Sequence, residues 1–396
     1  MKIDRVRTFR VEGPAESLVG VAEERQIGHL DIFPEYDARL PGGNPPTDEG
    51  GRPRKAEHFV EVHSDDGATG LFGPIFAPTA AIIQRHLKSH VIGRDPLAYE
   101  KLWDVLYRAD RHARKGYLMM AISALDNALW DLRGKAAGMP VYRLLGGPTR
   151  EQVPAYASML GHSLETERVI ERAREMVARG YRAQKWFFRY GPIHGLEGMR
   201  KNADLARIVR EAVGPDVEIM FDAWMGWDEA YAVRMMERIA DLDVRWVEEP
   251  VPADRINDFA AIRKATRVPV ATGEHEYTRW GFLTLLQAEA VDVIQADPDW
   301  AGGLTEMTKI CALASAYGKQ VCPHGHSVLP AIHLIAAQSP TVCPMAEFLV
   351  KYQPGAQFFQ KGFVEPVNGA FALPTAPGLG IALDEAKIDR IVEVEC

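Results

Sequence analysis

The chain of 396 residues has few cysteines, no excess of positive charge and no long apolar run. Its four cysteines, Cys311, Cys322, Cys343 and Cys396, form no C-x-x-C pair, which is typical of a reduced cytosolic protein rather than a disulfide framework. Lys and Arg total 46 against 54 Asp and Glu, giving a net charge of −8, so we expect no nucleic-acid partner. No uncharged apolar run reaches the length of a membrane span. The N-terminal MKIDRVRTFRVEG alternates like a strand and not like a signal peptide, so we expect a cytoplasmic protein without a membrane partner.

The first third of the chain has the pattern of a separate α+β unit. The turn Asp65–Gly67 joins two of its strand-like runs. Pro41–Pro53 is so rich in Gly and Pro that it excludes helix and inner strand, and we expect a mobile loop that orders over a ligand. The predicted strands are Ile3–Val11, His58–His63 and Ala68–Gly73, and the predicted helices are Thr79–Ser89, Leu97–Arg108 and Tyr117–Gly138.

From Val153 onward, short β-rich runs alternate with amphipathic helical stretches. Such repeats predict a parallel sheet, and eight of them favour a closed (β/α)₈-type barrel. A doubly wound open sheet is the alternative, but no strand is followed by a G-x-G-x-x-G turn. The predicted strands are Val153–Ser158, Ala183–Phe188, Glu218–Ala223, Val244–Pro250, Val268–Glu274, Val291–Asp297, Lys319–Gly325 and Met345–Val350. The predicted helices are Glu165–Arg179, Asp204–Val213, Asp228–Asp241, Asp254–Thr266, Thr278–Ala288, Leu304–Tyr317 and Ala331–Ala337.

Polar residues recur near the ends of these strands. One carboxylate at a strand end is usually a helix cap or a solvated residue, but a whole series in phase indicates a site. The carboxyl ends of barrel strands form one face, where active sites lie. The series is Lys185, Asp222, Glu248, Glu274, Asp297, His324 and Glu347, with the last five intervals 23 to 27 residues long.

Asp222, Glu248 and Glu274 come from three consecutive strands, which lie about 4.8 Å apart in a sheet. Three like charges at one point would raise one another's pKa unless a cation neutralised them. An all-oxygen donor set suits Mg²⁺. A solvated acidic rim is the alternative, but each carboxylate lies in a strongly apolar run, which favours the metal.

His324 and Asp297 end neighbouring strands, so a hydrogen bond between them is geometrically natural. The carboxylate would set the imidazole tautomer and raise its basicity, making His324 a general base. A lone histidine is more often a satisfied core residue, and His326 could compete for the role. The neighbouring carboxylate cluster and the strand-end position favour His324.

Taken together, these residues resemble the enolase superfamily in its mandelate-racemase branch, and within it the acid-sugar dehydratases of rhamnonate type. The similarity covers essentially the whole chain. The segments that carry it are Ala121–Gly147, FDAW at 221–224, VEEP at 247–250, GEH at 273–275, GGLTE at 302–306, the Asp297–Thr305 segment, PHG-x-SV at 323–328 and AEFL at 346–349.

The resemblance implies a (β/α)7β TIM-like barrel at 136–369 under an α+β capping domain at 1–135, completed by about 370–396. It implies Asp222, Glu248 and Glu274 as magnesium ligands and His324 with Asp297 as base. Glu347 would bind the substrate carboxylate or stabilise an enolate. Lys185 would act electrostatically, unless it is only a counter-ion. His29, Arg54, His275 and Trp186 are the substrate-binding candidates, and we expect a homo-oligomer.

One departure from the branch decides between reactions. Many of its racemases carry Lys-x-Lys on the second strand, whereas this chain has Lys185-Trp186-Phe187. With one base, dehydration of a sugar acid to a 2-keto-3-deoxy acid is easier than racemisation of a 2-hydroxy acid. A racemase, a Schiff-base lyase using Lys185 and a noncatalytic homologue are the alternatives.

Overall fold

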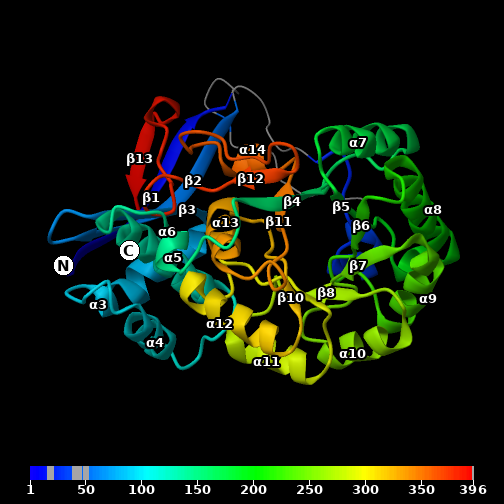
Figure 1. Cartoon of the computed structure of the whole chain (residues 1–396), viewed down its shortest axis with the longest axis horizontal. Coiled ribbons are helices and arrows are strands. Elements are labelled where there is room, and N and C mark those ends of the chain that lie inside the picture. The colour runs from blue at the N-terminus through cyan, green and yellow to red at the C-terminus, as the bar shows by residue number, and fades with distance from the viewer. Residues whose placement is uncertain (16–21, 38–46, 48–52, 395–396) are drawn as a thin grey trace.

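The computed structural model describes residues 1–15, 22–37, 47 and 53–394. There the chain forms an antiparallel sheet covered by helices and a ring of parallel strands enclosed by helices (Figure 1). The predicted loop Pro41–Pro53, apart from its residues 47 and 53, lies outside the described residues. None of the helices in the described ranges is both long and apolar enough to cross a bilayer.

The antiparallel sheet combines both ends of the chain. Its strands lie in the order β13-β1-β2-β3, where β1 is Ile3–Pro14, β2 Arg54–Ser64, β3 Thr69–Ile75 and β13 Arg390–Glu393. The three N-terminal strands and the turn between β2 and β3 confirm the sequence prediction. Strand β13 runs antiparallel to β1, so the last described residues extend the N-terminal sheet. The domain boundary at residue 135 stays a prediction.

Helices pack against this sheet, above all α5, which contacts both β2 and β3. Sixteen of its twenty residues are buried, so its apolar sequence reflects packing on several sides. The short elements before it are η1 (His29–Ile32), α1 (Pro34–Asp37), α2 (Ala77–Ile82), η2 (Ile83–Leu87), α3 (Lys88–Val91) and α4 (Tyr99–Ala109); α5 is Tyr117–Ala136 and α6 is Val141–Leu144.

The second part is a barrel of eight parallel strands in the order β10-β9-β8-β7-β6-β5-β4-β11. Strand β4 pairs with β11, and the Val321 N–H of β10 donates to Val342 O ahead of β11 at 2.7 Å, which continues the contact around the ring. The strands are β4 (Gln152–Ser158), β5 (Ala183–Phe187), β6 (Glu218–Asp222), β7 (Val244–Glu248), β8 (Val270–Thr272), β9 (Val293–Ile294), β10 (Gln320–Val321) and β11 (Ala346–Leu349), and β12 (Ala370–Ala372) adds antiparallel to β4.

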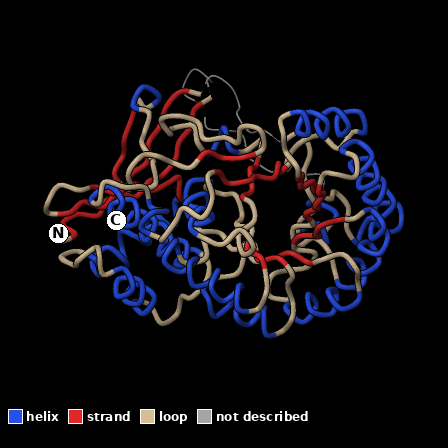
Figure 2. The backbone as a smooth tube through the Cα atoms, viewed as in Figure 1, coloured by secondary structure: helices blue, strands red, loops and turns tan. Residues whose placement is uncertain are grey.

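The barrel helices lie outside the ring of strands (Figure 2). The barrel prediction is therefore confirmed, and the doubly wound alternative is wrong, because that fold places helices on both faces of an open sheet. The helices are α7 (Thr166–Ala178), α8 (Gly195–Val213), α9 (Glu229–Ile239), α10 (Ile256–Ala265), α11 (Thr278–Gln287), α12 (Gly303–Ala316), α13 (Val328–Ala337) and α14 (Gln353–Ala356), with η3 (Pro192–His194), η4 (Ala240–Leu242) and η5 (Glu385–Lys387) as single turns.

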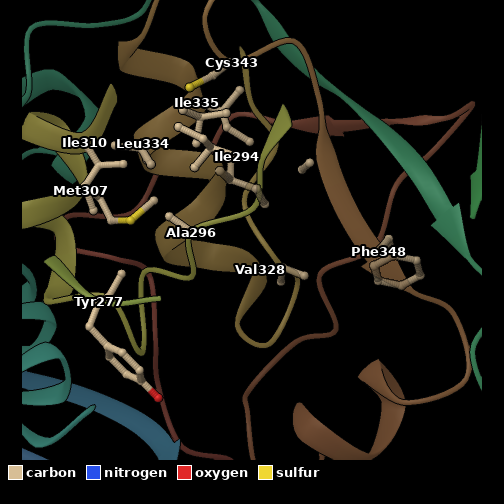
Figure 3. Close-up of a cluster of buried hydrophobic side chains, with 14 of the residues drawn as sticks. Tyr277, Ile294, Ala296, Met307, Ile310, Val328, Leu334, Ile335, Cys343 and Phe348 are labelled. Carbon is tan, nitrogen blue, oxygen red and sulfur yellow. The ribbon is translucent and has the colours of Figure 1, made fainter. Parts of the chain in front are cut away.

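Two apolar layers hold the barrel. Outside the sheet, Ile294 and Ala296 pack among side chains of α12 and α13, including Met307 and Leu334 (Figure 3). Inside the ring, a second layer contains one side chain from each strand or its flank: Tyr156, Ala183, Met220, Trp246, Ala271, Val293, Cys322 and Met345. The inner layer fills the barrel below the polar strand ends.

Helix α5 also anchors the segment between β9 and α12. Its Asp126 accepts hydrogen bonds from the Thr305 N–H and hydroxyl at 2.9 and 2.7 Å, which caps the start of α12. Its Asn127 donates to Pro298 O at 3.1 Å. Because Pro298 directly follows Asp297, the N-terminal part of the chain helps to position a predicted site residue.

Candidate active site

The seven polar residues predicted near strand ends lie together at the carboxyl end of the barrel. Their order around the ring follows the order of the strands. Six of them are at most 5 % exposed, and the side chain of His324 is 12 % exposed. Four lie on strands and three lie two or three residues beyond β8, β9 and β10: Lys185, Asp222, Glu248 and Glu347 in the first group, and Glu274, Asp297 and His324 in the second.

The sequence prediction placed Glu274, Asp297 and His324 at the ends of their strands. This is wrong, because the strands end two or three residues earlier. Gly273 has φ of +127°, a conformation that ends β8 before Glu274. Pro323 has no N–H for the ladder, so β10 ends before His324. The error does not move the side chains away from the common face of the barrel.

Strand alternation explains why these side chains point inward. Met220 belongs to the inner apolar layer and stands two residues before Asp222. Trp246 stands two residues before Glu248 in the same way. Since side chains two residues apart share a face of a strand, the apolar layer directs both carboxylates into the barrel mouth.

Lys185 lies among three carboxylates. Its Nζ is 2.8 Å from an oxygen of Glu248, 2.8 Å from Glu347 and 3.5 Å from Asp222. Burial alone would lower the pKa of Lys185, but the charges of Glu248 and Glu347 outweigh burial and raise that pKa well above its ordinary value. Lys185 is therefore a buried ammonium ion that links β5, β7 and β11.

One ammonium does not balance the negative charge of the cluster. Burial raises the pKa of Asp222 to about 7, with the charge of Glu274 adding to the rise and Lys185 opposing it. Burial likewise raises the pKa of Glu248 well above its ordinary value. Carboxyls whose ionisation is this costly fit a site that also receives a divalent cation.

A second group in the same place could also hold a cation. Ligand atoms of Glu249, Glu274 and His275 lie within 4.8 Å of one another. This group shares Glu274 with the predicted set, but it includes an imidazole whose Nδ1 is already 2.9 Å from Glu249. The all-oxygen set of Asp222, Glu248 and Glu274 has the donors that Mg²⁺ prefers, and its assignment stays a prediction.

His324 and Asp297 form the predicted pair. The Nδ1 of His324 is 2.5 Å from Asp297 Oδ2, and its Nε2 is 3.5 Å from Glu274 Oε2. Burial alone would lower the pKa of His324, but the charges of Glu274 and Asp297 raise it well above its ordinary value. The imidazole thus has one nitrogen fixed by a carboxylate and the other directed towards the acidic cluster.

Two of the four substrate-binding candidates border this cluster. His275 contacts Glu249 and lies 3.4 Å from Glu274; burial lowers its pKa, but Glu249 raises it to about 9. His29 lies in η1, with its ring centroid 6.0 Å from that of Trp224. Both placements are compatible with substrate contacts, which remain predictions.

The other two candidates lie elsewhere. Arg54 begins β2, and its guanidinium makes bonds of 2.9 and 2.6 Å to both carboxylate oxygens of Asp389 near β13. Trp186 is fully buried, with its indole N–H 3.2 Å from Gln184 Oε1. Because Lys185 points into the barrel, Trp186 points to the helix layer. These placements argue against direct substrate contacts for Arg54 and Trp186.

A pocket of about 400 Å³ opens beside the cluster. Trp224 forms part of its wall, and its backbone N–H donates to Asp222 Oδ1 at 2.9 Å. None of the seven polar residues of the cluster lines the pocket, so the pocket adjoins the cluster through Trp224. Its lining includes Gln26, His29, Leu160 and Tyr352. A cleft between loops of both parts of the chain is a common location for a small-molecule site.

Two further residues belong to the cluster and were not among the sequence predictions. Glu249 is buried against His275, although it was visible as the second glutamate of VEEP. Gln295 donates to Glu248 Oε2 at 2.5 Å. Gln295 could have been predicted from its position two residues before Asp297, because residues two apart in an extended chain share a face.

Comparison with protein families matches residues 52–146 to the mandelate racemase / muconate lactonizing enzyme N-terminal domain. Residues 168–387 match the enolase C-terminal domain-like family. An L-rhamnonate dehydratase of Saccharopolyspora erythraea is 36 % identical over 411 aligned residues, covering 98 % of this chain and 99 % of that protein.

Solved structures show the same similarity. The crystal structure of L-rhamnonate dehydratase from Gibberella zeae superposes with a TM-score of 0.83 and 30 % identity, covering 99 % of this chain and 96 % of that one. Another structure of the Gibberella zeae enzyme, complexed with Mg, gives a TM-score of 0.82 at 29 % identity, covering 98 % and 95 %. The chain therefore belongs to the enolase superfamily, in its mandelate racemase and muconate lactonizing enzyme branch.

Proposed function

We propose that this protein is a magnesium-dependent dehydratase of a rhamnonate-like sugar acid, a hydro-lyase that produces a 2-keto-3-deoxy acid. The observation that carries the proposal is the His324–Asp297 pair, whose free imidazole nitrogen faces the buried carboxylates. The full-length similarity to an L-rhamnonate dehydratase supports the substrate class.

In this proposal His324 removes the C2 proton of the substrate. Asp297 holds Nδ1, so Nε2 is the nitrogen that accepts the proton, and Asp297 stabilises the resulting imidazolium. The step requires a neutral imidazole, which a cation held by Glu274 would favour by offsetting the charge that raises the pKa of His324. The C2 electron pair then forms an enediolate and expels the C3 hydroxyl. The same imidazolium returns its proton to the departing oxygen, water leaves, and the enol ketonises.

Asp222, Glu248 and Glu274 would hold Mg²⁺, which when bound supplies positive charge for the substrate carboxylate and for the developing enediolate. Lys185 adds a fixed positive charge beside Glu248. Glu347 lies against Lys185, and its Oε2 accepts the Gly325 N–H at 2.9 Å. We assign Glu347 to orienting the substrate carboxylate or stabilising the enediolate.

A racemase is the second candidate, because it would use the same metal and His324. It also needs a proton donor on the opposite face of the enediolate. Phe187 occupies that position: it shares the inward face of β5 with Lys185 and lies opposite Asp222 in the ladder. A phenyl ring transfers no proton, which favours dehydration.

A Schiff-base lyase requires a neutral, accessible amine. Lys185 is instead held as an ammonium by Glu248 and Glu347 at 2.8 Å each. Trapping with borohydride should therefore label no lysine in the presence of a turned-over acid.

Three further expectations belong to this proposal. Residues 1–135 with about 370–396 would form the capping domain, and 136–369 the catalytic barrel. The protein would act in the cytoplasm. It would assemble as a homo-oligomer. Limited proteolysis tests the domain boundaries, and sedimentation tests the oligomeric state.

The first test is a screen of acid sugars with magnesium, with semicarbazide detecting keto-acid. We expect turnover of at least one six-carbon acid and loss of that turnover in EDTA. A protein that produces keto-acid equally well in EDTA would contradict the metal-dependent mechanism.

The second test concerns the single base. In His324→Asn we expect loss of dehydration and of C2-proton exchange with D₂O, followed by proton NMR for both C2 epimers of an accepted acid. His63→Asn is the matched control. His63 also pairs with a carboxylate, that of Glu61 at 2.8 Å, but both residues lie on β2 of the antiparallel sheet. Exchange of either epimer by His324→Asn would reveal a second base and contradict the dehydratase assignment.

A further inference from the structure

A second Asp–His pair lies beside the one assigned to proton transfer. Asp299 and His326 each stand two residues after their counterparts, so both pairs have the same separation of 27 residues along the chain. The Nδ1 of His326 is 2.7 Å from Asp299 Oδ2, close to the 2.5 Å of the first pair. Asp299 is only 5 % exposed, whereas the side chain of His326 is 26 % exposed. A buried carboxylate thus fixes one nitrogen of a partly accessible imidazole.

Trp300 contacts the histidine of each pair. Its ring centroid lies 4.8 Å from that of His324 and 5.3 Å from that of His326. The ring of Phe76 lies 5.5 Å from that of His326 and 6.4 Å from that of Trp300. Phe76 directly follows β3, in the part of the chain outside the barrel. These ring contacts therefore connect the proton-transfer pair at the barrel mouth with the antiparallel unit.

Two features of the rings around His326 indicate a place for a ligand. The indole N–H of Trp300 is buried but has no hydrogen-bond acceptor among the described residues. An unpartnered buried donor costs about 1–3 kcal/mol, which an acceptor on a ligand would remove. Phe76 is 41 % exposed, so a large apolar ring faces the region above His326. A hydrogen-bonding group and an apolar surface therefore lie side by side.

We propose that His326 and Trp300 bind hydroxyls at the far end of the sugar acid, while Phe76 packs against its terminal carbon. Asp299 is a positioning residue, because it acts by orienting His326. This inference rests on the proposed function: with C2 at His324, whose ring lies 4.8 Å from that of Trp300, the proposal directs the rest of the carbon chain past Trp300 and not into the pocket lined by His29 and Trp224. His326, Trp300 and Phe76 would together select six-carbon acids, especially those ending in a methyl group.

His326 is unsuited to replace His324 as the base. The Nε2 of His324 lies 3.5 Å from Glu274, and the substrate carboxylate and C2 must lie near that cluster. Among the described residues, the recorded side-chain ion pair of His326 is with Asp299 alone. Its removal should therefore alter substrate selection and leave proton abstraction in place.

The test compares His326→Asn, Asp299→Asn and Phe76→Ala with the wild type on aldonic acids of six and four carbons, with magnesium. We expect His326→Asn and Asp299→Asn to lower kcat/KM for the preferred six-carbon acid about tenfold or more, mainly through KM, as expected for one lost hydrogen bond. Four-carbon acids, which do not reach His326, should change less than twofold. His63→Asn again serves as control, with a side-chain exposure of 28 % that matches His326.

For Phe76→Ala we expect a reduced preference for 6-deoxy acids over acids ending in a hydroxymethyl group. The C2 proton of four-carbon acids should still exchange in His326→Asn, in contrast to His324→Asn. An equal loss on long and short acids, or loss of exchange, would overturn the inference by assigning His326 to the chemistry. No change on any acid would overturn it by excluding a contact between His326 and the substrate.

Calorimetric binding of the same acids separates this inference from the proposed function. A wild-type protein that binds six-carbon acids without producing keto-acid would refute the dehydratase, yet the loss of that binding in His326→Asn would still support the contact between His326 and the acid. A wild-type protein that binds no six-carbon acid would overturn both.

Discussion

Replacing Lys185 by Met removes the ammonium ion from the centre of the acidic cluster while keeping a side chain of similar length. Lys185 is 3 % exposed and lies within 3.5 Å of three carboxylates. Removing one partner of a buried ion pair typically costs about 3–5 kcal/mol, because the remaining charge loses its counter-ion. At pH 8 and in EDTA we therefore expect Lys185→Met to lose about that much free energy of unfolding.

Magnesium should reverse part of this loss. An ion that binds only the folded state stabilises it by about 2.7 kcal/mol at one hundred times its dissociation constant. Removing a fixed positive charge beside Asp222 and Glu248 should also strengthen the binding of a cation. The stability gap between Lys185→Met and the wild type should therefore narrow when magnesium replaces EDTA.

The assay is urea unfolding followed by circular dichroism. The wild type and Lys185→Met are each measured in EDTA and in magnesium. Lys201→Met is the matched control: Lys201 also pairs with a carboxylate, Glu197 at 3.0 Å, but on the surface of α8, so no measurable loss is expected. Failure of magnesium to stabilise either protein would refute the cation site, and a gap that magnesium leaves unchanged would refute the predicted effect of Lys185 on cation binding. A variant as stable as the wild type in EDTA would refute the electrostatic account of Lys185.

Three further predictions concern other residues. Glu248→Gln should weaken magnesium binding and abolish turnover, and unchanged magnesium affinity by calorimetry would contradict its role as a ligand. Burial lowers the pKa of His333 from 6.5 to about 4, so the stability it confers is present above pH 6.5 and is lost as the pH falls towards 4. The wild type should lose about 1 kcal/mol from this source between pH 7.5 and 5.5, a loss absent from His333→Gln in urea titrations. Gly303→Ala should destabilise the protein more than Gly214→Ala. Both glycines have φ near +78°, but a Cβ at Gly303 would lie 2.6 Å from Asp126, whereas a Cβ at Gly214 would meet no atom. Equal melting temperatures of the two variants would contradict this.

The barrel could be predicted because its signal is repeated. Eight short apolar runs separated by helical stretches leave few alternatives, and polar residues at matching positions predicted the common face. The orientation of Trp186 was also available in principle. If Lys185 points into the barrel, its neighbour on the strand must point outward, so Trp186 could have been excluded from the pocket by parity alone.

Other features depend on contacts that sequence patterns do not encode. Helix α8 begins at Gly195 rather than Asp204, and its first half contains buried Met199, whose sulfur accepts a hydrogen bond from Arg238 of α9. Arg54 was predicted to contact substrate because it lies between the first strands, where the resembled family has substrate contacts. Its partner, Asp389, is 335 residues away and approaches only because the C-terminal segment reaches the N-terminal sheet.

The position of the proposed base depends on a helix far from it in the sequence. Asp297, Asp299 and Trp300 lie in the segment between β9 and α12. Asn127 of α5 holds Pro298 in this segment, and Asp126 caps the helix that follows it. A substitution that shifts α5 would therefore move Asp297 and Asp299 together, and with them His324 and His326. For this reason the apolar packing of α5 contributes to proton transfer and to substrate selection as well as to the stability of the antiparallel unit.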